Sequence, residues 1–472
     1  MVTATETNTI LSAYLDEAGW SPRVLAREIN KLFGAGTVSD TAPYYWRDKG
    51  GVPRHPLPAL TAYVLSRRLG HPVEVRRLWQ GAVSDSAAVT LATNGIELPW
   101  TMDSTVRVAQ DWVMAGLTDR RVFLAVSGAA LARAVWAYLT REAPLGQLSA
   151  AVPAGGDSPL LAQIEQSIPL LQRLDDAKGG AANLSYVGAQ VRAVSLVLAE
   201  GGHSAATTRR LLVALAELAQ LAGWMAFDAD RHGLAQRYLF TALRASHDAG
   251  YTAMAGHVLA DLSVQATTLD QSEDAVVLGE AATRAAAKTT SSVRASITSR
   301  LAHAYAGANR VREFHRARGQ ALDLLDKRNL EHDPEWMYYL TPNHLDCQAG
   351  YSLILAGRRQ RGAGDTSGGN RLIRDGQRLL RTGAHQVPLD HASQRRALYE
   401  GAWLSLGYAT RGQLEAACDA GRVAITRLNH VRSPRSVDLL RQLATDLNKR
   451  KRNQAVGEFV PDLYAALTQH SA

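Results

Sequence analysis

The chain has 472 residues, 46% hydrophobic and 20% charged, a composition typical of globular proteins and not of disordered ones. A chain of this length is too long to fold around one ordinary hydrophobic core, so we expect two or three domains. The net charge of +8 suits an anionic partner, either nucleic acid or an acidic membrane surface, without choosing between them. Cys347 and Cys418 are too few for a disulfide framework and lack zinc-ligand spacing, so we interpret them as small core residues.

No targeting or membrane segment is recognisable. The first eight residues are polar and rich in threonine, unlike a secretory signal. The longest apolar stretch, Val122 to Leu139, is interrupted by Arg133 and is too short to span a bilayer. We therefore expect a cytoplasmic protein with no membrane partner.

The first 81 residues predict four or five short helices. Gly19 ends the first, and Ser21-Pro22 supplies an N-cap and a first-turn proline for a second that runs to Phe33. Further helices are expected from Asp40 to about Lys49, from Leu57 to Gly70 and after His71.

Two composition changes divide the rest of the chain. Residues 82–104 have the composition of a linker, and a helical segment is expected from Val122 to Thr140. Residues 151–158 are rich in proline and glycine, whereas helical periodicity continues from about Leu160 to the end. We predict domains at 1–81 and 159–472 joined by a connector at 82–158, with a flexible polar insertion at Arg361–Asn370.

The last domain repeats a pattern of small residues. Gly223 is followed by Ala235 and Ala242, and Ser263, forty residues later, is followed by Ala275 and Ala282. A third copy is less regular and holds Leu301, Ala302, Tyr305, Phe314 and Ala321. A fourth copy is the sharpest and holds Trp403, Leu406, Gly407, Ala417 and Ala424. The WxxLG and A-x6-A spacings resemble the tetratricopeptide repeat over about residues 160 to 445. This resemblance implies an all-α solenoid; a generic bundle rich in alanine and leucine is the alternative.

Residues 21–53 carry a candidate DNA-binding pattern. Leu25, Ala26 and Ile29 form one buried face, and Pro43 and Trp46 would face inward from the next helix. Thr41, Tyr44, Tyr45 and Asp48 then face outward, flanked by Arg47 and Lys49, and Arg54 could contact phosphate. Taken singly, the aromatic residues fit a core, and the basic residues a solvated face, equally well.

The run SDTAPYYWRDKGGVP, from Ser39 to Pro53, resembles phage-repressor-like helix-turn-helix domains. That family has glutamate after the tryptophan, where this chain has Arg47, and a branched aliphatic residue in place of Pro43. Seven extra residues, from Lys31 to Thr37, lengthen the turn. These departures leave the register of the recognition helix open.

The whole arrangement resembles actinobacterial regulators of development and antibiotic production, a part of secondary metabolism, and more broadly peptide-sensing quorum regulators. This resemblance implies a cytoplasmic homodimer that binds double-stranded DNA and whose repeat domain senses a peptide or small-molecule effector. Aligning the repeats predicts a set of ligand-binding residues on the inner helices: Gln220, Trp224, Asp228, His257, Thr267 and His303.

Signatures of catalysis are absent from the sequence. No GxxxxGK, HExxH, GxSxG or CxxC motif occurs, and His385 and His391 are poorly spaced for a shared metal. We expect no enzymatic activity and no cofactor, because no constellation supports a lyase or hydrolase on an α/α scaffold. The main alternative is a tetratricopeptide adaptor that binds partner proteins and whose degenerate N-terminal domain no longer binds DNA.

Overall fold

The computed structural model describes residues 7–33, 37–53, 57–69, 73, 75–80, 98, 100–118, 131, 135, 138–140, 159–383, 387–388 and 393–470. Every regular element in these ranges is a helix: twenty α-helices and two short 3-10 helices. They belong to two compact units, Met1–Trp100 with Gln110–Ala137, and Thr101–Ala109 with Tyr138–Ala472. The predicted all-α class is confirmed for the described part of the chain.

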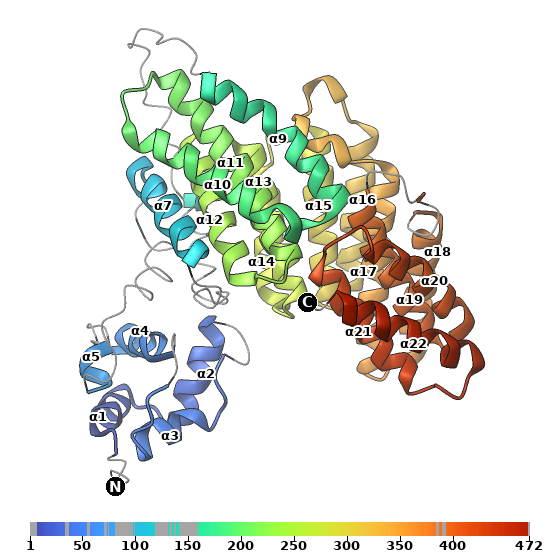
Figure 1. Cartoon of the computed structure of the whole chain (residues 1–472), viewed down its shortest axis with the longest axis horizontal. Coiled ribbons are helices and arrows are strands. Elements are labelled where there is room, and N and C mark those ends of the chain that lie inside the picture. Colours follow the sequence, from blue (N-terminus) through green and yellow to red (C-terminus); the bar gives the residue numbers. More distant parts are fainter. Residues whose placement is uncertain are drawn as a thin grey trace. The chain divides into compact units, whose positions relative to one another are not determined.

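The first unit contains five short helices close to their predicted bounds: α1 (Thr9–Ala18), α2 (Pro22–Phe33), α3 (Ala42–Asp48), α4 (Leu57–Leu69) and α5 (Val75–Leu78) (Figure 1). The backbone N–H of Val24 donates to the Ser21 hydroxyl at 3.3 Å, which is the expected cap of α2. Gly19 ends α1 in the left-handed region, at φ 66°, where glycine has no steric cost.

The core of this unit forms from one face of each helix. Leu11, Leu25 and Ile29 are fully buried. Trp46 meets Trp79 edge to face, with ring centroids 5.9 Å apart, and the Trp79 indole N–H donates to the Pro58 carbonyl. The tryptophan contact joins α3 to the end of α5.

The connector holds a helix that was not predicted, and only its first turn overlaps the linker expected at residues 82–104. α7 (Met102–Thr118) begins where the Thr101 hydroxyl accepts from the Ser104 N–H, and Val106, Val108 and Ala109 are buried. Its serine and threonine residues resemble a linker but here serve as an N-cap. Residues 151–158, and most of the helix expected at Val122–Thr140, lie outside the described residues.

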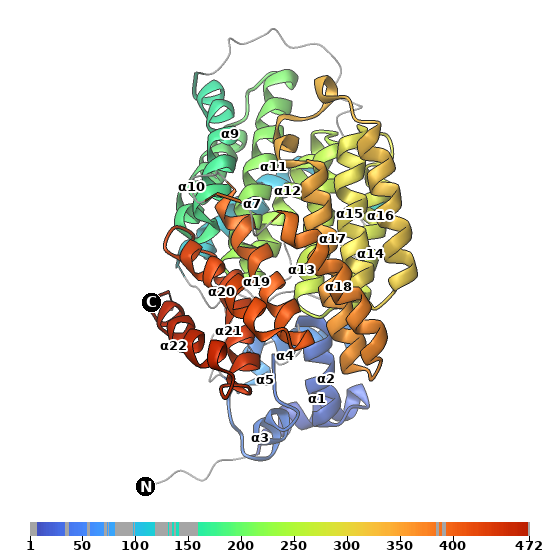
Figure 2. The ribbon, with the colours of Figure 1, turned by 90° about the vertical axis from the view of Figure 1, so that its right-hand side faces the viewer.

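The second unit is a series of helices packed as consecutive hairpins. Its elements are α9 (Pro159–Lys178), α10 (Gly180–Glu200), α11 (Ala205–Asp228), α12 (His232–Asp248), α13 (Thr252–Thr268), α14 (Ser272–Ala285), α15 (Ser291–Gly307), α16 (Val311–Asp326), α17 (Pro342–Gly362), α18 (Thr366–Gly383), α19 (Gln394–Arg411), α20 (Leu414–Leu428), α21 (Pro434–Asn448) and α22 (Gln454–Gln469). From α11 onward each odd-numbered helix packs against the next even-numbered one. Figure 2 shows the hairpins of α13 to α18 side by side. The arrangement is solenoid-like.

Small residues let the two helices of a hairpin cross closely, as predicted. A Cβ on Gly223 would lie 2.7 Å from the Leu239 side chain. The hydroxyls of Ser263 and Ser405 donate to the carbonyls of Ala275 and Ala417, at 2.6 and 2.7 Å. Both bonds span twelve residues, so the same crossing recurs in two hairpins.

The turns inside the hairpins repeat a backbone conformation. Asp230, Asp270 and Asn309 have φ of 59°, 61° and 58°, and Gly364 and Gly412 occupy the same place in the next two hairpins, at 99° and 79°. Aspartate, asparagine and glycine are the residues that tolerate the left-handed region. This column of residues is a repeat signal that the alanine spacing alone did not show.

The flexible insertion predicted at Arg361–Asn370 is wrong. α17 continues to Gly362 and α18 starts at Thr366, so only a tight turn separates them. A Cβ on Gly357 would lie 2.6 Å from the Gly369 carbonyl oxygen, and one on Gly369 would lie 2.5 Å from the Gly357 carbonyl oxygen. The glycines that suggested a loop are instead needed for a close helix crossing.

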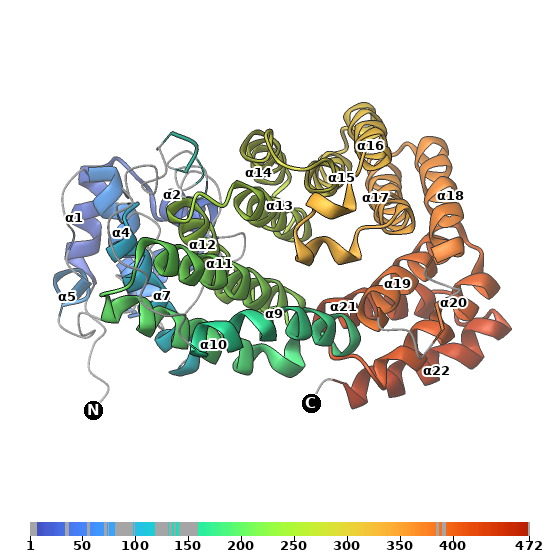
Figure 3. The same cartoon turned by 90° about the horizontal axis from the view of Figure 1, so that it is seen from above.

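The first helices of successive hairpins pack on one another, and the series closes. α11, α13, α15, α17, α19 and α21 form a chain of contacts, and α9 packs on α19 while α11 packs on α21. Figure 3 shows α14, α16 and α18 outside α13, α15 and α17. The Arg432 N–H donates to the Lys178 carbonyl at 2.8 Å across this closure. The inner helices therefore surround a space.

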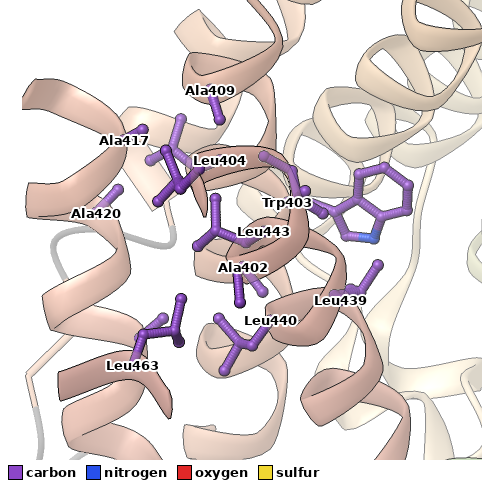
Figure 4. Close-up of a cluster of buried hydrophobic side chains, with 14 of the residues drawn as sticks. Ala402, Trp403, Leu404, Ala409, Ala417, Ala420, Leu439, Leu440, Leu443 and Leu463 are labelled. Carbon is purple, nitrogen blue, oxygen red and sulfur yellow. The ribbon is translucent and has the colours of Figure 1, made fainter. Parts of the chain in front are cut away.

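Two local features complete this unit. The 3-10 helices η2 (Leu330–His332) and η3 (Glu335–Tyr339) link α16 to α17, and η3 packs on α9. Between the last hairpins, Leu440 and Leu443 fill the space beside Ala402 and Leu463 (Figure 4). This apolar core fixes α19 and α21, which carry arginines of the site described below.

Candidate functional site

The outward face of α3 is held by buried anchors on its opposite side. Pro43 and Trp46 are buried, as predicted. The Asn8 N–H donates to the Arg47 carbonyl at 2.8 Å, and the Asn8 amide donates to the Leu78 carbonyl at 3.0 Å. The short helix is therefore tied through Asn8 to the start of α1 and the end of α5, and presents a defined face.

That face combines tyrosines with polar and basic residues. Tyr44 and Tyr45 are 38% and 59% exposed, and Thr41 and Lys49 are exposed as well. The connection from α2 is closed by Asn30, whose amide donates to and accepts from the backbone of Val38 at 2.8 and 2.9 Å. Of the six predicted DNA-binding residues, only Arg54 lies outside the described residues.

Arg47 is not a free cation. Its guanidinium donates two hydrogen bonds to the Asp48 carboxylate, at 2.7 and 3.2 Å, and lies 5.5 Å from the Tyr44 ring centroid. These hydrogen bonds raise the pKa of Arg47 and lower the pKa of Asp48. Lys49 is the exposed cation of this face without such a partner among the described residues.

A cavity of about 610 Å³ lies within the second unit. Its walls come from the inner helices α9, α11, α13, α15, α17, α19 and α21, together with η3. Volumes of roughly 300 to 1,000 Å³ are typical of small-molecule sites. The walls are lined by aromatic side chains and arginines, so this is the second candidate site.

Three arginines surround one tryptophan at the centre of the cavity wall. The guanidinium carbons of Arg300, Arg395 and Arg435 lie 5.8, 5.7 and 5.3 Å from the Trp224 ring centroid. Arg435 also stacks over the Tyr399 ring at 4.2 Å. Such cation–π contacts hold the guanidiniums flat against aromatic surfaces.

Carboxylates hold these arginines: Asp175 lines the cavity, whereas Asp228 and Asp261 lie outside its lining. Asp261 pairs with Arg300 at 3.2 Å, Asp175 with Arg395 at 3.1 Å and Asp228 with Arg435 at 3.4 Å. Burial raises the pKa of Asp175 to about 7, and raises the pKa of Asp261 as well, against the opposing effect of the arginines. Asp175 thus carries less than a full negative charge at neutral pH.

Two histidines of the wall are neutral hydrogen-bond acceptors on one nitrogen. The guanidiniums of Arg300 and Arg396 lie 2.7 and 2.9 Å from Nδ1 of His257 and His344. Arginine only donates, so each Nδ1 accepts and the ring proton sits on Nε2. Burial and the neighbouring arginines lower the pKa of both histidines far below its usual range.

The structure places three of the six predicted ligand-binding residues at this cavity. Gln220, Trp224 and His257 line it. Asp228, Thr267 and His303 do not, which corrects the predicted inward register. Asp228 follows Gln220 by eight residues, and Thr267 follows His257 by ten. At 3.6 residues per turn, each of these spacings turns the later side chain about 80° around the helix axis from the earlier one.

The three displaced residues stabilise helix packing. Asp228 is fully buried and accepts from the Gly180 N–H and the Ser433 hydroxyl. Thr267 packs against Gly307, where a Cβ would lie 2.6 Å from its methyl group. His303 lies 2.9 Å from the Ser352 hydroxyl, and burial lowers its pKa to about 3.

The arginines of the cavity and η3 were not predicted from the sequence. Arg300, Arg395 and Arg435 lie on α15, α19 and α21, and no spacing in the sequence connects them. Trp336 of η3 lines the cavity, and its indole donates to the Tyr251 hydroxyl at 2.8 Å. The aromatic run WMYY between two helices was the available signal for a segment folded into the interior.

Two general features bear on the site. Among the described residues no group of His, Cys, Asp and Glu is arranged to hold a metal ion. Within the same ranges α11 alone is long and apolar enough to cross a membrane, and 78% of its most apolar window is buried, as in a core helix.

Comparison with known proteins reaches only the first unit. Residues 11–78 match the family model of the SP15 N-terminal domain. No curated protein matches the chain. The stretch from α1 to α5, which carries the α3 face, is thus the part similar to a recognised domain.

Proposed function

We propose that the chain is a sequence-specific DNA-binding transcription regulator whose repeat domain dimerises and binds a controlling ligand. The observation that carries this proposal is the rigidly anchored, outward face of α3. A helix that presents exposed polar and aromatic side chains from a fixed base suits the major groove of DNA.

In this proposal α2 and α3 act as a helix-turn-helix pair, with α3 as the recognition helix. Thr41, Tyr44 and Tyr45 lie in its N-terminal half, from which such helices reach base edges. Lys49 and Arg47 would contact phosphates and fix the orientation on the duplex. Arg54, just after the helix, would add a further phosphate contact.

The hairpins of the second unit act in this proposal as a tetratricopeptide-like sensor. The small residues at the helix crossings and the inner helices around a cavity support it. A homodimer formed through this unit would present two copies of α3 to two half-sites, which raises affinity through the second contact.

The experiment is a mobility-shift series with the full-length protein and a library of duplexes. Tyr45→Ala should change the preferred sequence, whereas Lys49→Ala should weaken binding to all sequences. Tyr186→Ala is the matched control, because Tyr186 is 57% exposed on α10 in the other unit and should leave binding unchanged.

An adaptor is the second candidate, and one observation favours it. The pairing of Arg47 with Asp48 reduces the positive charge of α3, and exposed tyrosine and arginine are enriched at protein interfaces. If no duplex is preferred at any salt concentration while the protein stays folded, the adaptor replaces the regulator.

A further inference from the structure

The cavity wall carries five arginines, whose side chains can only donate hydrogen bonds: Arg173, Arg300, Arg395, Arg396 and Arg435. The wall also holds the carboxylates of Asp175, Asp176 and Glu400. Arg173 is exposed and has no ion pair among the described residues. Its N–H groups are therefore available to a hydrogen-bond acceptor on a ligand.

The charges of the wall leave a small positive excess. Arg300, Arg396 and Arg435 each pair with one carboxylate and Arg395 pairs with two, whereas Arg173 has no ion pair among the described residues. Burial raises the pKa of Asp175 and of Glu400 to about 7, so both are partly protonated at neutral pH. This small positive excess suits a ligand with one negative charge better than a ligand with two.

The shape of the wall selects a flat body. Trp224 is half-buried and offers its ring beside three guanidiniums, while Trp336 and Tyr351 add further aromatic surface. Leu221 and Val264 contribute apolar surface. Aromatic rings and guanidinium planes both stack on flat unsaturated groups.

We propose that this cavity binds a flat, unsaturated small molecule that carries a single carboxylate. The carboxylate accepts from the Arg173 guanidinium, and the flat body stacks in the aromatic wall near Trp224. As the effector that controls DNA binding, such a molecule rests on the proposed function. Its binding to the cavity does not.

The test uses 2-naphthoate, indole-3-acetate and benzoate, each beside its neutral amide, and inorganic phosphate. Binding to the full-length protein is followed by calorimetry and by quenching of tryptophan fluorescence. At least one acid should bind with a dissociation constant below about 1 mM and at least about tenfold more tightly than its amide. Phosphate should bind more weakly than that acid.

Variants locate the binding. Arg173→Gln should abolish the preference for the acid over the amide, and Arg441→Gln, at a half-exposed arginine of α21 paired with Asp438, should leave it unchanged. The exposed Arg173 can be replaced with little cost to folding.

Three results would overturn the proposal: no acid binds, an acid and its amide bind equally, or phosphate binds most tightly. DNA binding is measured separately by mobility shift. If the protein binds an acid but no duplex, the ligand site is supported and the proposed regulator is rejected. If it binds a duplex but no acid, the regulator is supported and this ligand is rejected.

Discussion

At the scale of single residues, the balance of charge on α3 would set how strongly the proposed regulator attracts DNA. Asp48 lies on the outward side and its carboxylate binds Arg47 through two hydrogen bonds. A phosphate has to compete with this carboxylate for the guanidinium. The Arg47–Asp48 pair would therefore weaken the phosphate contact that the sequence alone predicts for Arg47.

Asp48→Asn should strengthen DNA binding by about two- to tenfold at low salt. It should also steepen the slope of log affinity against log salt concentration by about one, the equivalent of one more released counterion. The reason is that the substitution releases Arg47 for phosphate and removes one negative charge. Anisotropy titrations over a range of salt concentrations measure both quantities. Asp419→Asn, which breaks the comparable Arg422 pair on α20, is the control. Unchanged or weaker binding in Asp48→Asn would argue against α3 as the DNA-contacting helix.

At the scale of helices, the crossing of α17 and α18 depends on glycine. Gly357→Ala should destabilise the second unit by about 1 to 3 kcal/mol, because its Cβ meets the Gly369 backbone, which cannot move alone. Gly319→Ala, on α16, has open space and should be neutral or stabilising by up to about 1 kcal/mol. Denaturant unfolding measures both. Equal effects of the two substitutions would contradict the close crossing.

A partly buried glutamate should make the hairpins sensitive to pH. Glu217 on α11 accepts from the Tyr251 hydroxyl at 2.9 Å, and burial raises its pKa to about 7. A raised pKa in the folded state means that Glu217 favours folding below its unfolded pKa and loses this contribution as pH rises through about 7.

Glu217→Gln should therefore gain thermal stability relative to the unsubstituted protein between pH 5 and pH 8. Glutamine keeps an oxygen that accepts from Tyr251 but cannot ionise. Glu415→Gln is the control without a pH-dependent effect in this range, because the Asn453 amide lowers the pKa of the exposed Glu415 and its carboxylate stays ionised. Melting temperatures over this pH range test both variants. A Glu217→Gln variant whose stability relative to the unsubstituted protein falls as pH rises would refute the assignment.

The helices themselves could be predicted because caps and periodicity are local signals. Ser21-Pro22, Gly19 and the alanine spacings each act within a few residues, and the structure has helices where they indicate. The same local reasoning failed at Arg361–Asn370, where glycine serves a tertiary crossing, and at α7, where serine and threonine serve as caps. In both places composition has two physical meanings that only packing separates.

At the scale of the whole molecule, the cavity exists because distant segments meet. Arg395 binds Asp175 across 220 positions, and the Ser433 hydroxyl binds Asp228 across 205. No local pattern encodes such contacts, so the sequence placed Trp224 and His257 correctly on inner helices but missed the arginines that surround them. The site could be found only once the closure of the hairpin series was known.

The most direct test of the central claim is selection of duplexes from a random-sequence pool by the full-length protein, with sequencing of the bound fraction. The proposed regulator should enrich one motif, arranged as two half-sites if the protein is a dimer. Substituting Tyr45 and Lys49 together by alanine should remove the enrichment, while Tyr186→Ala should retain it. A bound fraction with the same composition as the input pool, obtained with folded protein at low salt, would contradict the proposal that this chain is a sequence-specific DNA-binding protein.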